Sequence, residues 1–572
     1  MSTLLKLDKN IRKFIPDDFQ VKDWLSLKPY YEDLLQREIH SAQDLRKWFQ
    51  DRSELESVLA EDAGWRYIKM TCNTTDDQLR DRFTYFVTQI EPNIAPKSNL
   101  LNRKAFKSPF FDDLDIEGYN ILKKAMEVEL KIFRENNIPL LTEIQTETQK
   151  YGAITGAMTV YIEGKELTLP QASDILQSTD RNKREEAYQK ISERRSQDKD
   201  KLNELYSHLV NLRDKMAKNA DFKNFRDYIF AALKRFDFTP EVCFEFHSSV
   251  AEEVVPILNE LARDRKEKLQ VEILKPWDKN VDPSGKEPLK PFKTSEELVD
   301  KTITCLNRLD PFLGECLAIM KSMGHLDLES RKGKSPGGYN YPLAEVGVPF
   351  IFMNATSTLR DLVTLLHEGG HAVHSLLTHG LELNNFKDTP SEIAELASMS
   401  MELITMDHWD VFFENEDDLK RAKRYHLEQI IETLPWVATI DKFQHWVYEN
   451  PGHTLEERNI TWNNIFDSFS DNLTDWSGLE EYKIYLWQKQ LHLYEVPFYY
   501  IEYGIAQLGA IAIWKNFREN KEKGLQSYFN ALKLGYTKSI PEVYEAARVK
   551  FNFSKSYINE LISFIKEELS RI

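Results

Sequence analysis

The chain has 572 residues, a formal net charge of −17, a hydrophobic share of 41% and an aromatic share of 12%. These values are typical of a folded globular protein and exclude a disordered one. The acidic balance argues against nucleic acid as a partner, because phosphate binding requires a basic surface. No stretch has the apolar length of a membrane helix, and the N-terminus lacks the apolar core of a signal peptide. The sequence therefore predicts a cytoplasmic protein without membrane contact.

The cysteines are scattered along the chain, with no CxxC pair. This spacing provides neither a disulfide framework nor a thiolate cluster for a metal, and it fits a reducing compartment. The four are Cys72, Cys243, Cys305 and Cys316.

Amphipathic helices are predicted for most of the chain. In residues 27–60 and 181–218, apolar residues recur three and four positions apart, with charged residues between them. The charge clusters of the second stretch are typical of a solvated helix face. Residues 156–170 differ, because side-chain character alternates about Gly164 and Lys165, and this predicts a short β-hairpin.

Two irregular features follow. Proline-rich sequence from Asp282 to Lys293 predicts either a linker between domains or a surface loop within one. Turn residues then precede a β-prone run from Glu345 to Met353. The part of this run from Gly347 onward is interpreted either as an edge strand that pairs with an extended peptide or as a strand buried in the fold.

The stretch "LVTLLHEGGHAVHSLL", residues 362–377, has the pattern of an amphipathic helix. Thr358 and Asp361 have the spacing of a capping box, which predicts one helix over residues 357–379.

This predicted helix carries the motif of a catalytic zinc site. Positions i and i+4 share a helix face, so His367 and His371 can present ring nitrogens to one ion. Glu368 lies beside that face, where its carboxylate can take a proton from a zinc-polarised water. The other interpretation is a helix whose histidines are satisfied by hydrogen bonds.

A catalytic zinc of this kind requires a third protein ligand, and a second predicted helix offers three acids. Thr389 is its expected N-cap and Pro390 its first residue, with Glu392 completing a capping box. Glu395, one turn in, is the preferred ligand, and Glu392 is the other candidate. Glu402 is positioned to accept the second ring N–H of a ligand histidine. The alternative leaves all three glutamates as surface acids.

The run HEGGHAVHSLL, followed after a short insertion by AELASMSMEL, resembles the M3 family of zinc oligopeptidases, and most closely its oligoendopeptidase F branch. The N-terminal run beginning FIPDDFQVKDW and the C-terminal PFYYIEYGIAQLGA also resemble this branch, so the similarity spans most of the chain. In the family, the glutamate ligand follows the second histidine by about two dozen residues, and Glu395 lies 24 residues after His371. The resemblance implies one zinc ion per chain held by His367, His371 and Glu395. It also implies Glu368 as general base and Glu402 as the family's second acid.

Three further positions in the first helix are open to interpretation. Gly370 matches the family, whereas Gly369 stands where relatives usually carry a bulky apolar residue. A central glycine costs a helix about 1 kcal/mol relative to alanine, so Gly370 predicts the close approach of another backbone or of the substrate. His374 is predicted to be packed rather than to be a third histidine ligand. The three-histidine zinc motif has glycine at that place and histidine three residues on, where this chain has Leu377.

Residues 491–509, "LHLYEVPFYYIEYGIAQLG", are rich in tyrosine. Pro497 predicts the start of a helix, which puts Tyr500 and Tyr503 on one face. Packing is the ordinary role of clustered tyrosines, but the resemblance implies that Tyr500, Tyr503 and His492 stabilise the oxyanion formed on a peptide carbonyl. His492 matches less closely, because its spacing to Tyr500 differs by about a residue from the mammalian relatives. Other members of the branch also have a histidine where Pro497 stands.

The implied fold is a mostly α, two-lobed helical clamshell with a deep central channel and a small β-sheet next to the HExxH helix. We divide the chain into an N-terminal helical lobe with the hairpin, residues 1–195, and a zinc metallopeptidase region, residues 196–572. The second region contains the HExxH core, residues 335–510, followed by C-terminal helices.

The channel implies a zinc-dependent endopeptidase that takes short, flexible peptides. One alternative is a C-terminal exopeptidase, either a carboxypeptidase or a dipeptidyl carboxypeptidase. Another is a non-catalytic zinc-stabilised peptide-binding protein, which Glu368 disfavours because a structural site needs no base. The sequence does not indicate an oligomeric state.

Overall fold

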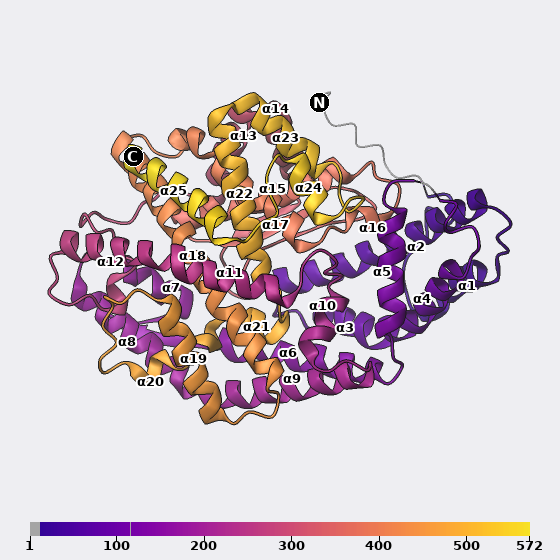
Figure 1. The fold of residues 1–572 in the computed structure, drawn as a ribbon, viewed down its shortest axis with the longest axis horizontal. Coiled ribbons are helices and arrows are strands. Elements are labelled where there is room, and N and C mark those ends of the chain that lie inside the picture. The colour runs from indigo at the N-terminus through magenta and orange to yellow at the C-terminus, as the bar shows by residue number, and fades with distance from the viewer. Residues whose placement is uncertain (1–11, 115) are drawn as a thin grey trace.

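The computed structural model, which describes residues 12–114 and 116–572, consists mainly of helices with two small sheets (Figure 1). The mostly α fold predicted from the periodicity is confirmed. The N-terminal helices are α1 (Trp24–Gln36), α2 (Ala42–Cys72), α3 (Asp77–Tyr85), the π-helical η1 (Phe86–Ile90), α4 (Glu91–Phe106) and α5 (Tyr119–Ile132).

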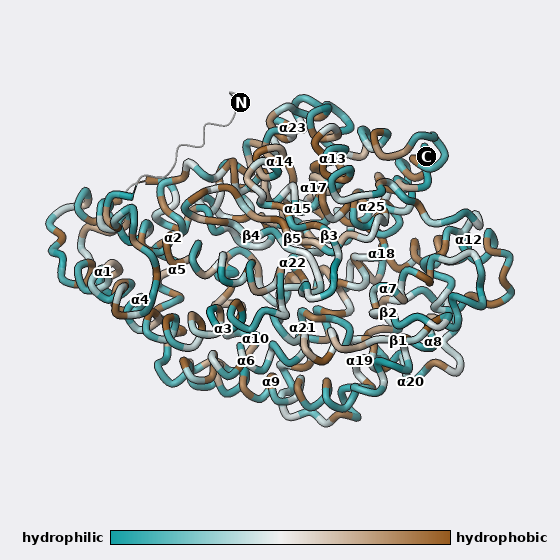
Figure 2. Tube along the Cα trace, turned by 180° about the vertical axis from the view of Figure 1, so that it is seen from behind, coloured by the Kyte–Doolittle hydropathy of each residue, from teal (hydrophilic) through white to brown (hydrophobic). Residues whose placement is uncertain are grey.

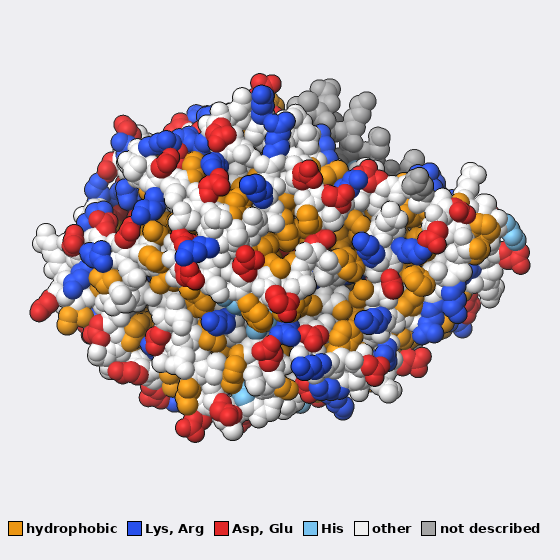
Figure 3. Space-filling view, viewed as in Figure 1, with side chains coloured by type: hydrophobic (Ala, Val, Ile, Leu, Met, Phe, Trp, Pro, Cys, Tyr) orange, Lys and Arg blue, Asp and Glu red, His pale blue; other side chains and the backbone are white. Residues whose placement is uncertain are grey.

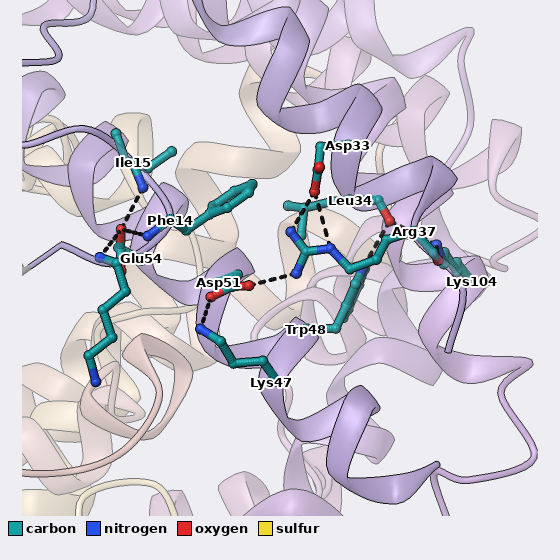
Figure 4. A network of polar contacts seen from close by, with 11 residues as sticks. Phe14, Ile15, Asp33, Leu34, Arg37, Lys47, Trp48, Asp51, Glu54 and Lys104 are labelled. Atoms are coloured by element: carbon teal, nitrogen blue, oxygen red, sulfur yellow. Dashed lines mark hydrogen bonds and ion pairs between the residues drawn. The ribbon is translucent and has the colours of Figure 1, made fainter. Parts of the chain in front are cut away.

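These first helices share a hydrophobic core of their own, and polar contacts tie them together (Figure 4). The indole N–H of Trp48 on α2 donates to the carbonyl of Leu34 on α1 at 2.9 Å. Arg37, which follows α1, lies 2.6 Å from a carboxylate oxygen of Asp51 on α2. The carboxylate of Glu54 accepts hydrogen bonds from backbone N–H groups of the chain that enters the lobe. Leu383 and Phe386, at the start of and within α16 (Asn384–Lys387), also pack in this core.

The middle of the chain continues in helices. They are α6 (Asn137–Gly156), α7 (Leu169–Asp174), η2 (Ile175–Gln177), α8 (Arg181–Gln197), α9 (Lys199–Asn219), α10 (Phe225–Ala232), α11 (Pro240–Glu253), α12 (Val255–Leu269), η3 (Pro276–Asp278), α13 (Ser295–Leu309) and α14 (Pro311–Met323). The predicted hairpin is confirmed, with β1 (Thr159–Ile162) antiparallel to β2 (Lys165–Thr168). Glu163 and Gly164 both have positive φ, 50° and 76°, as the two turn residues of a tight hairpin require.

The remaining helices complete the chain. They are α15 (Leu359–Thr378), α16 (Asn384–Lys387), α17 (Ser391–Ile404), η4 (Met406–Val411), α18 (Glu416–Glu449), α19 (Leu455–Phe469), α20 (Glu480–Lys483), η5 (Leu486–Lys489), α21 (Leu491–Glu495), α22 (Ile501–Glu519), α23 (Lys521–Leu532), α24 (Ile540–Ala546) and α25 (Lys555–Arg571). One large hydrophobic core runs from Leu140 to Leu569 through these elements. The division of the chain at residue 195 stays a prediction.

The proline-rich segment 282–293 is irregular, as predicted. Phe292 at its end is buried in the same hydrophobic core as Trp277 before it and Leu298 after it. The segment is therefore a loop within one body of the protein and not a linker between domains.

The second sheet lies beside α15 in a region rich in hydrophobic residues (Figure 2). Its strand order is β3 (Leu326–Glu329), β5 (Phe350–Ala355), β4 (Tyr339–Tyr341), so β5 is paired on both sides. The expected strand began at Glu345, but β5 begins at Phe350, because Gly347 has a φ of +68° and Pro349 has no N–H to donate. The interpretation of residues 347–353 as an edge strand for an extended peptide is wrong, since β5 has no free edge.

The motif helix forms as predicted. In α15, Thr358 is the N-cap and makes a capping box with Asp361. The second helix begins one residue later than expected: α17 starts at Ser391, and Pro390 is the N-cap without a side-chain bond. Thr389 therefore does not cap it, and the expected capping box with Glu392 is wrong. Helices α15 and α17 pack closely, and this contact brings the motif histidines to the acids of α17.

None of the helices in the described ranges combines the length and the apolar character that a bilayer span requires. On the face seen in Figure 3, acidic and basic side chains are interspersed rather than gathered by sign.

The two glycines of α15 differ in what surrounds them. A Cβ on Gly370 would lie 2.5 Å from the Cα of Ser398 and 2.8 Å from the carbonyl oxygen of Ala397, both on α17. A Cβ on Gly369 would have no atom within 4 Å. The predicted close approach at Gly370 is thus made by a helix backbone, and Gly369 has no such neighbour.

We predict that Gly370→Ala destabilises the protein by about 1–3 kcal/mol or more, because a packed backbone has to move. The matched variant Gly369→Ala is expected to stabilise it by up to about 1 kcal/mol, through helix propensity alone. Urea unfolding of both variants measures the two changes. Equal effects of the two substitutions would contradict the assigned contact.

Candidate active site

Three predicted metal ligands converge between α15 and α17. Nε2 of His367 lies 3.2 Å from Oε2 of Glu395, and Nε2 of His371 lies 3.7 Å from the same oxygen. One donor atom from each residue can be chosen so that all three lie within 4.8 Å of one another. The i, i+4 spacing on α15 and the position of Glu395 one turn into α17 produce this arrangement.

These separations fit a tetrahedral metal ion. Two ligands each about 2.0–2.1 Å from zinc at a tetrahedral angle lie roughly 3.3 Å apart, close to the two separations found here. Two imidazole nitrogens with one carboxylate oxygen are also a donor set that zinc favours and that leaves a fourth position open. The residues present therefore fit a catalytic metal.

Glu402 lies on the far side of His367, as the sequence predicts. Its Oε1 is 2.6 Å from Nδ1 of His367, so this nitrogen donates to the carboxylate and Nε2 is directed toward Glu395. The other oxygen, Oε2, lies 3.5 Å from Nε2 of His426 on α18. No local pattern pointed to His426, since its partner Glu402 lies on another helix.

Charge and burial give the two site acids Glu368 and Glu395 different pKa values. Burial raises the pKa of Glu368 to about 7, within the range useful for a general base. Burial acts in the same direction on Glu395, but His371, His367 and the Tyr499 hydroxyl outweigh it and lower the pKa of this carboxyl to about 2. Glu395 is consequently ionised at neutral pH and able to ligate.

The two histidines also differ. Burial lowers the pKa of His371 to about 4, so the ring is neutral with a lone pair available. Burial also lowers the pKa of His367, but the carboxylates of Glu395 and Glu402 outweigh it and raise this pKa well above its ordinary value. The carboxylates of Glu395 and Glu402 therefore favour a positive charge at the His367 ring.

Tyr499 is a site residue that the sequence reasoning missed. Its hydroxyl donates to Oε1 of Glu395 at 2.8 Å and leaves Oε2 facing the histidines. Tyr499 precedes Tyr503 by four residues, and their rings lie in contact with centroids 5.4 Å apart. The FYY run was visible in the sequence, but the partner of Tyr499 lies on another helix and could not be read from it.

The segment before α22 is not helical where Pro497 predicted it. The helix begins at Ile501, because Phe498 has a φ of +66° and its N–H is held by Oε1 of Gln444 at 2.6 Å. The predicted neighbours Tyr500 and Tyr503 are still in contact, with centroids 5.3 Å apart. His492 joins them despite its less regular spacing, with Nε2 3.4 Å from the Tyr503 hydroxyl.

A directed chain of hydrogen bonds ends at Tyr503. The Trp436 indole donates to Oε1 of Gln490 at 3.0 Å, which leaves the Gln490 NH₂ group to donate to Nδ1 of His492 at 2.6 Å. His492 therefore carries its proton on Nε2 and directs it at the Tyr503 oxygen. Burial lowers the pKa of His492 to about 4, so the ring stays neutral. The Tyr503 proton is then free to be donated elsewhere.

Glu392, the other candidate ligand, lies apart from the three donors. It is buried, and Oε1 is 3.8 Å from Nε of Arg235 on the segment after α10. Arg235 also donates to Oε1 of Glu502 at 2.8 Å and to the carbonyl of Phe498. Glu392 thus belongs to a buried ion cluster that supports the tyrosine segment.

His374 is buried on α15, as predicted, and burial lowers its pKa to about 3. It does not join the three donors.

A second group of ligand-type side chains is buried between α11 and α18. Cys243, Asp441 and His445 have donor atoms within 4.8 Å of one another, and Nε2 of His247 donates to Asp441 at 2.8 Å. The His445 ring packs on Phe498, with centroids 5.1 Å apart. This group therefore packs against the tyrosine segment at Phe498.

Known proteins resemble this chain over most of its length. A family model described as Peptidase family M3 matches residues 175–562, and one described as Peptidase M3 N-terminal domain matches residues 14–133. The molecule is accordingly a peptide hydrolase. The chain belongs to peptidase family M3, in its oligoendopeptidase F branch.

Individual relatives cover most of the chain. The solved structure of PZ peptidase A with inhibitor 2 has a TM-score of 0.91 and 28% identity, over 98% of this chain and 99% of that one. An oligoendopeptidase F homolog of Borreliella burgdorferi is 26% identical over 439 residues, which are 72% of this chain and 69% of that protein. A second, from Lactococcus lactis, is 22% identical over 412 residues, 71% of this chain and 66% of that protein.

We predict that Tyr499→Phe weakens zinc binding roughly 10- to 100-fold, because the carboxylate of Glu395 loses the hydrogen bond that orients it. Tyr500→Phe is the matched control, since the Tyr500 hydroxyl bonds Trp436 and no ligand. Zinc titration against a competing chelator measures both variants. Unchanged affinity in Tyr499→Phe would refute the orienting role.

Proposed function

We propose that the chain is a zinc-dependent endopeptidase that hydrolyses internal bonds of short, unstructured peptides. The observation that carries the proposal is the convergence of His367, His371 and Glu395 with Glu368 adjacent on the same helix. We propose one zinc ion per chain held by these three ligands. When bound, zinc polarises a water molecule and the substrate carbonyl.

Glu368 is proposed as the general base. Its carboxylate is buried, and a pKa of about 7 allows it to accept a proton from the attacking water at neutral pH. It then passes this proton to the nitrogen of the leaving amine. A binding protein without turnover has no use for such a base, which disfavours that alternative.

Tyr503 is proposed as the main donor to the oxyanion. The chain from Trp436 through Gln490 and His492 delivers a hydrogen bond to its oxygen, so its own proton points onward. The carboxylates of Glu395 and Glu368 raise its pKa further above the level set by burial, which is consistent with a hydroxyl close to the ligands and the base. Tyr500 instead bonds Trp436, so we assign it a supporting role beside His492.

The substrate is proposed to enter a cavity of about 990 Å³ whose wall includes His492, Tyr500 and Tyr503. Helices α8, α9, α12 and α18 enclose the cavity, so a flexible peptide can reach the site whereas a folded protein cannot. A C-terminal exopeptidase remains the second candidate, because such an enzyme binds the terminal carboxylate of its substrate and this cavity has cations on its wall.

We predict that Glu368→Gln lowers kcat about 10²- to 10⁴-fold, because proton transfer to a positioned base is lost. Zinc content is expected to stay near one ion per chain, since no ligand changes. Turnover of an internally quenched peptide and metal analysis measure the two quantities. Glu414→Gln, a change at an exposed glutamate, controls for the loss of one charge. Full activity in Glu368→Gln would rule out this mechanism.

Removal of single hydroxyls distinguishes the two tyrosines. Tyr503→Phe is expected to lower kcat roughly 10²-fold with little change in KM, because an oxyanion donor acts mainly in the transition state. Tyr500→Phe is expected to have a smaller effect. The reverse order would transfer the donor role to Tyr500.

A further inference from the structure

The proposed substrate cavity contains basic side chains beyond the reacting groups. Those on its wall are Arg195, Lys199, Arg265, Lys279, Arg360 and Lys489. A channel for neutral peptide backbone has no need of cations. Whether each cation is already paired with a carboxylate of the protein therefore indicates if it is available to a ligand.

Most carboxylates of the cavity are already matched to particular cations. Asp471 lies 2.8 Å from Lys279. Glu428 lies 3.8 Å from Arg265, and Glu432 accepts a hydrogen bond from Gln429 at 2.7 Å. Lys199, at the cavity wall, lies 2.5 Å from Glu481.

Lys489 and Arg195 differ from these cations. Within the described residues, no carboxylate lies within 4.0 Å of either side chain, and neither donates a side-chain hydrogen bond. Arg360 likewise has no such partner, but it is exposed in the first turn of α15. The Lys489 ammonium lies over the ring of Trp436, 4.6 Å from its centroid, and remains open to solvent in the cavity. The surrounding walls and the charges of Arg195 and Lys279 lower the pKa of Lys489 to about 8, so it is mainly protonated at neutral pH.

Trp436 connects Lys489 to the reacting groups. The indole carries Lys489 over its face, while its N–H begins the chain that leads through Gln490 to His492. The Tyr500 hydroxyl lies beside the same indole N–H. A peptide whose scissile carbonyl meets Tyr503 therefore has Lys489 within reach of residues a short distance along its chain, and Arg195 lines the same cavity.

We propose that Lys489 and Arg195 form a subsite that binds a carboxylate of the peptide substrate. Two uncompensated cations on a partly desolvated wall attract an anion strongly, and a guanidinium can bind a carboxylate through two hydrogen bonds. In an oligopeptide, this carboxylate is either the C-terminus or an Asp or Glu side chain. The subsite rests on the proposed peptidase function, and a C-terminal ligand would limit cleavage to bonds at a set distance from the peptide end.

The test compares one internally quenched peptide, without acidic residues, as the free C-terminal acid and as the C-terminal amide. The wild-type protein is expected to cleave the acid with a kcat/KM roughly 10- to 100-fold higher, as for the loss of a charge-assisted hydrogen bond. Lys489→Met and Arg195→Met are expected to reduce this ratio toward one, and Lys489→Arg to restore it. Lys199→Met, which removes a cation already paired with Glu481, is expected to keep the wild-type ratio.

A third peptide identifies the source of the carboxylate. It is the amide with a single glutamate placed at successive positions after the scissile bond. Recovery of wild-type rates at one position, lost again in Lys489→Met, assigns the subsite to an acidic side chain. No recovery at any position assigns it to the C-terminus.

Binding measured without turnover separates the subsite from the catalytic proposal. Glu368→Gln protein is expected to bind the acid more tightly than the amide in calorimetry, and the double variant with Lys489→Met to bind both equally. Equal binding of acid and amide to Glu368→Gln, or an unchanged preference in both cation variants, would overturn the subsite. If the wild type cleaves no peptide while the binding preference is intact, the peptidase proposal alone is refuted.

Discussion

The contact of α15 with α17 at Gly370 is the constraint on which the site depends. With only hydrogen at this position, the two helix axes approach until the Ser398 backbone lies where a side chain would be. At this separation the two histidines on α15 come within 3.2 and 3.7 Å of a carboxylate oxygen on α17. A methyl group would push the helices apart at the centre of the contact, and a change of a few tenths of an ångström alters metal geometry.

The charges that this contact buries are arranged in successive shells. Glu395 faces His367 and His371, Glu402 holds the back of His367, and Tyr499 holds the outer oxygen of Glu395. Further out, Arg235 balances Glu392 and Glu502 and fixes the backbone at Phe498. Burying unpaired charge is costly, so each layer requires the next one to be in place. The result is a rigid environment for the site residues, whose positions must be held to within a fraction of an ångström of the productive geometry.

The sequence predicted those features that depend on local spacing. The capping box at Thr358, the i, i+4 histidines and the hairpin at Gly164 follow from neighbours in the chain. Family spacing selected Glu395 as the third ligand. At Gly370 the sequence predicted the close approach of another backbone or of the substrate, without naming the neighbour. Errors arose where a tertiary partner overrode a local signal: Phe498 is held left-handed by Gln444, which delays the helix expected at Pro497. For β5 the sequence left an edge strand and a buried strand open, and the pairing with β4 on its second side decides for the buried strand.

Residues without a local signal had to come from the structure. Tyr499 lies 104 residues from the carboxylate that it orients, and no spacing rule connects them. The same separation has a consequence during synthesis of the protein. The two motif helices emerge from the ribosome well before the segment with His492, Tyr499 and Tyr503, so an incomplete chain lacks the hydroxyl that holds Glu395 and the proposed donor to the oxyanion. The complete set of proposed site residues therefore comes together only after nearly the whole sequence has been made.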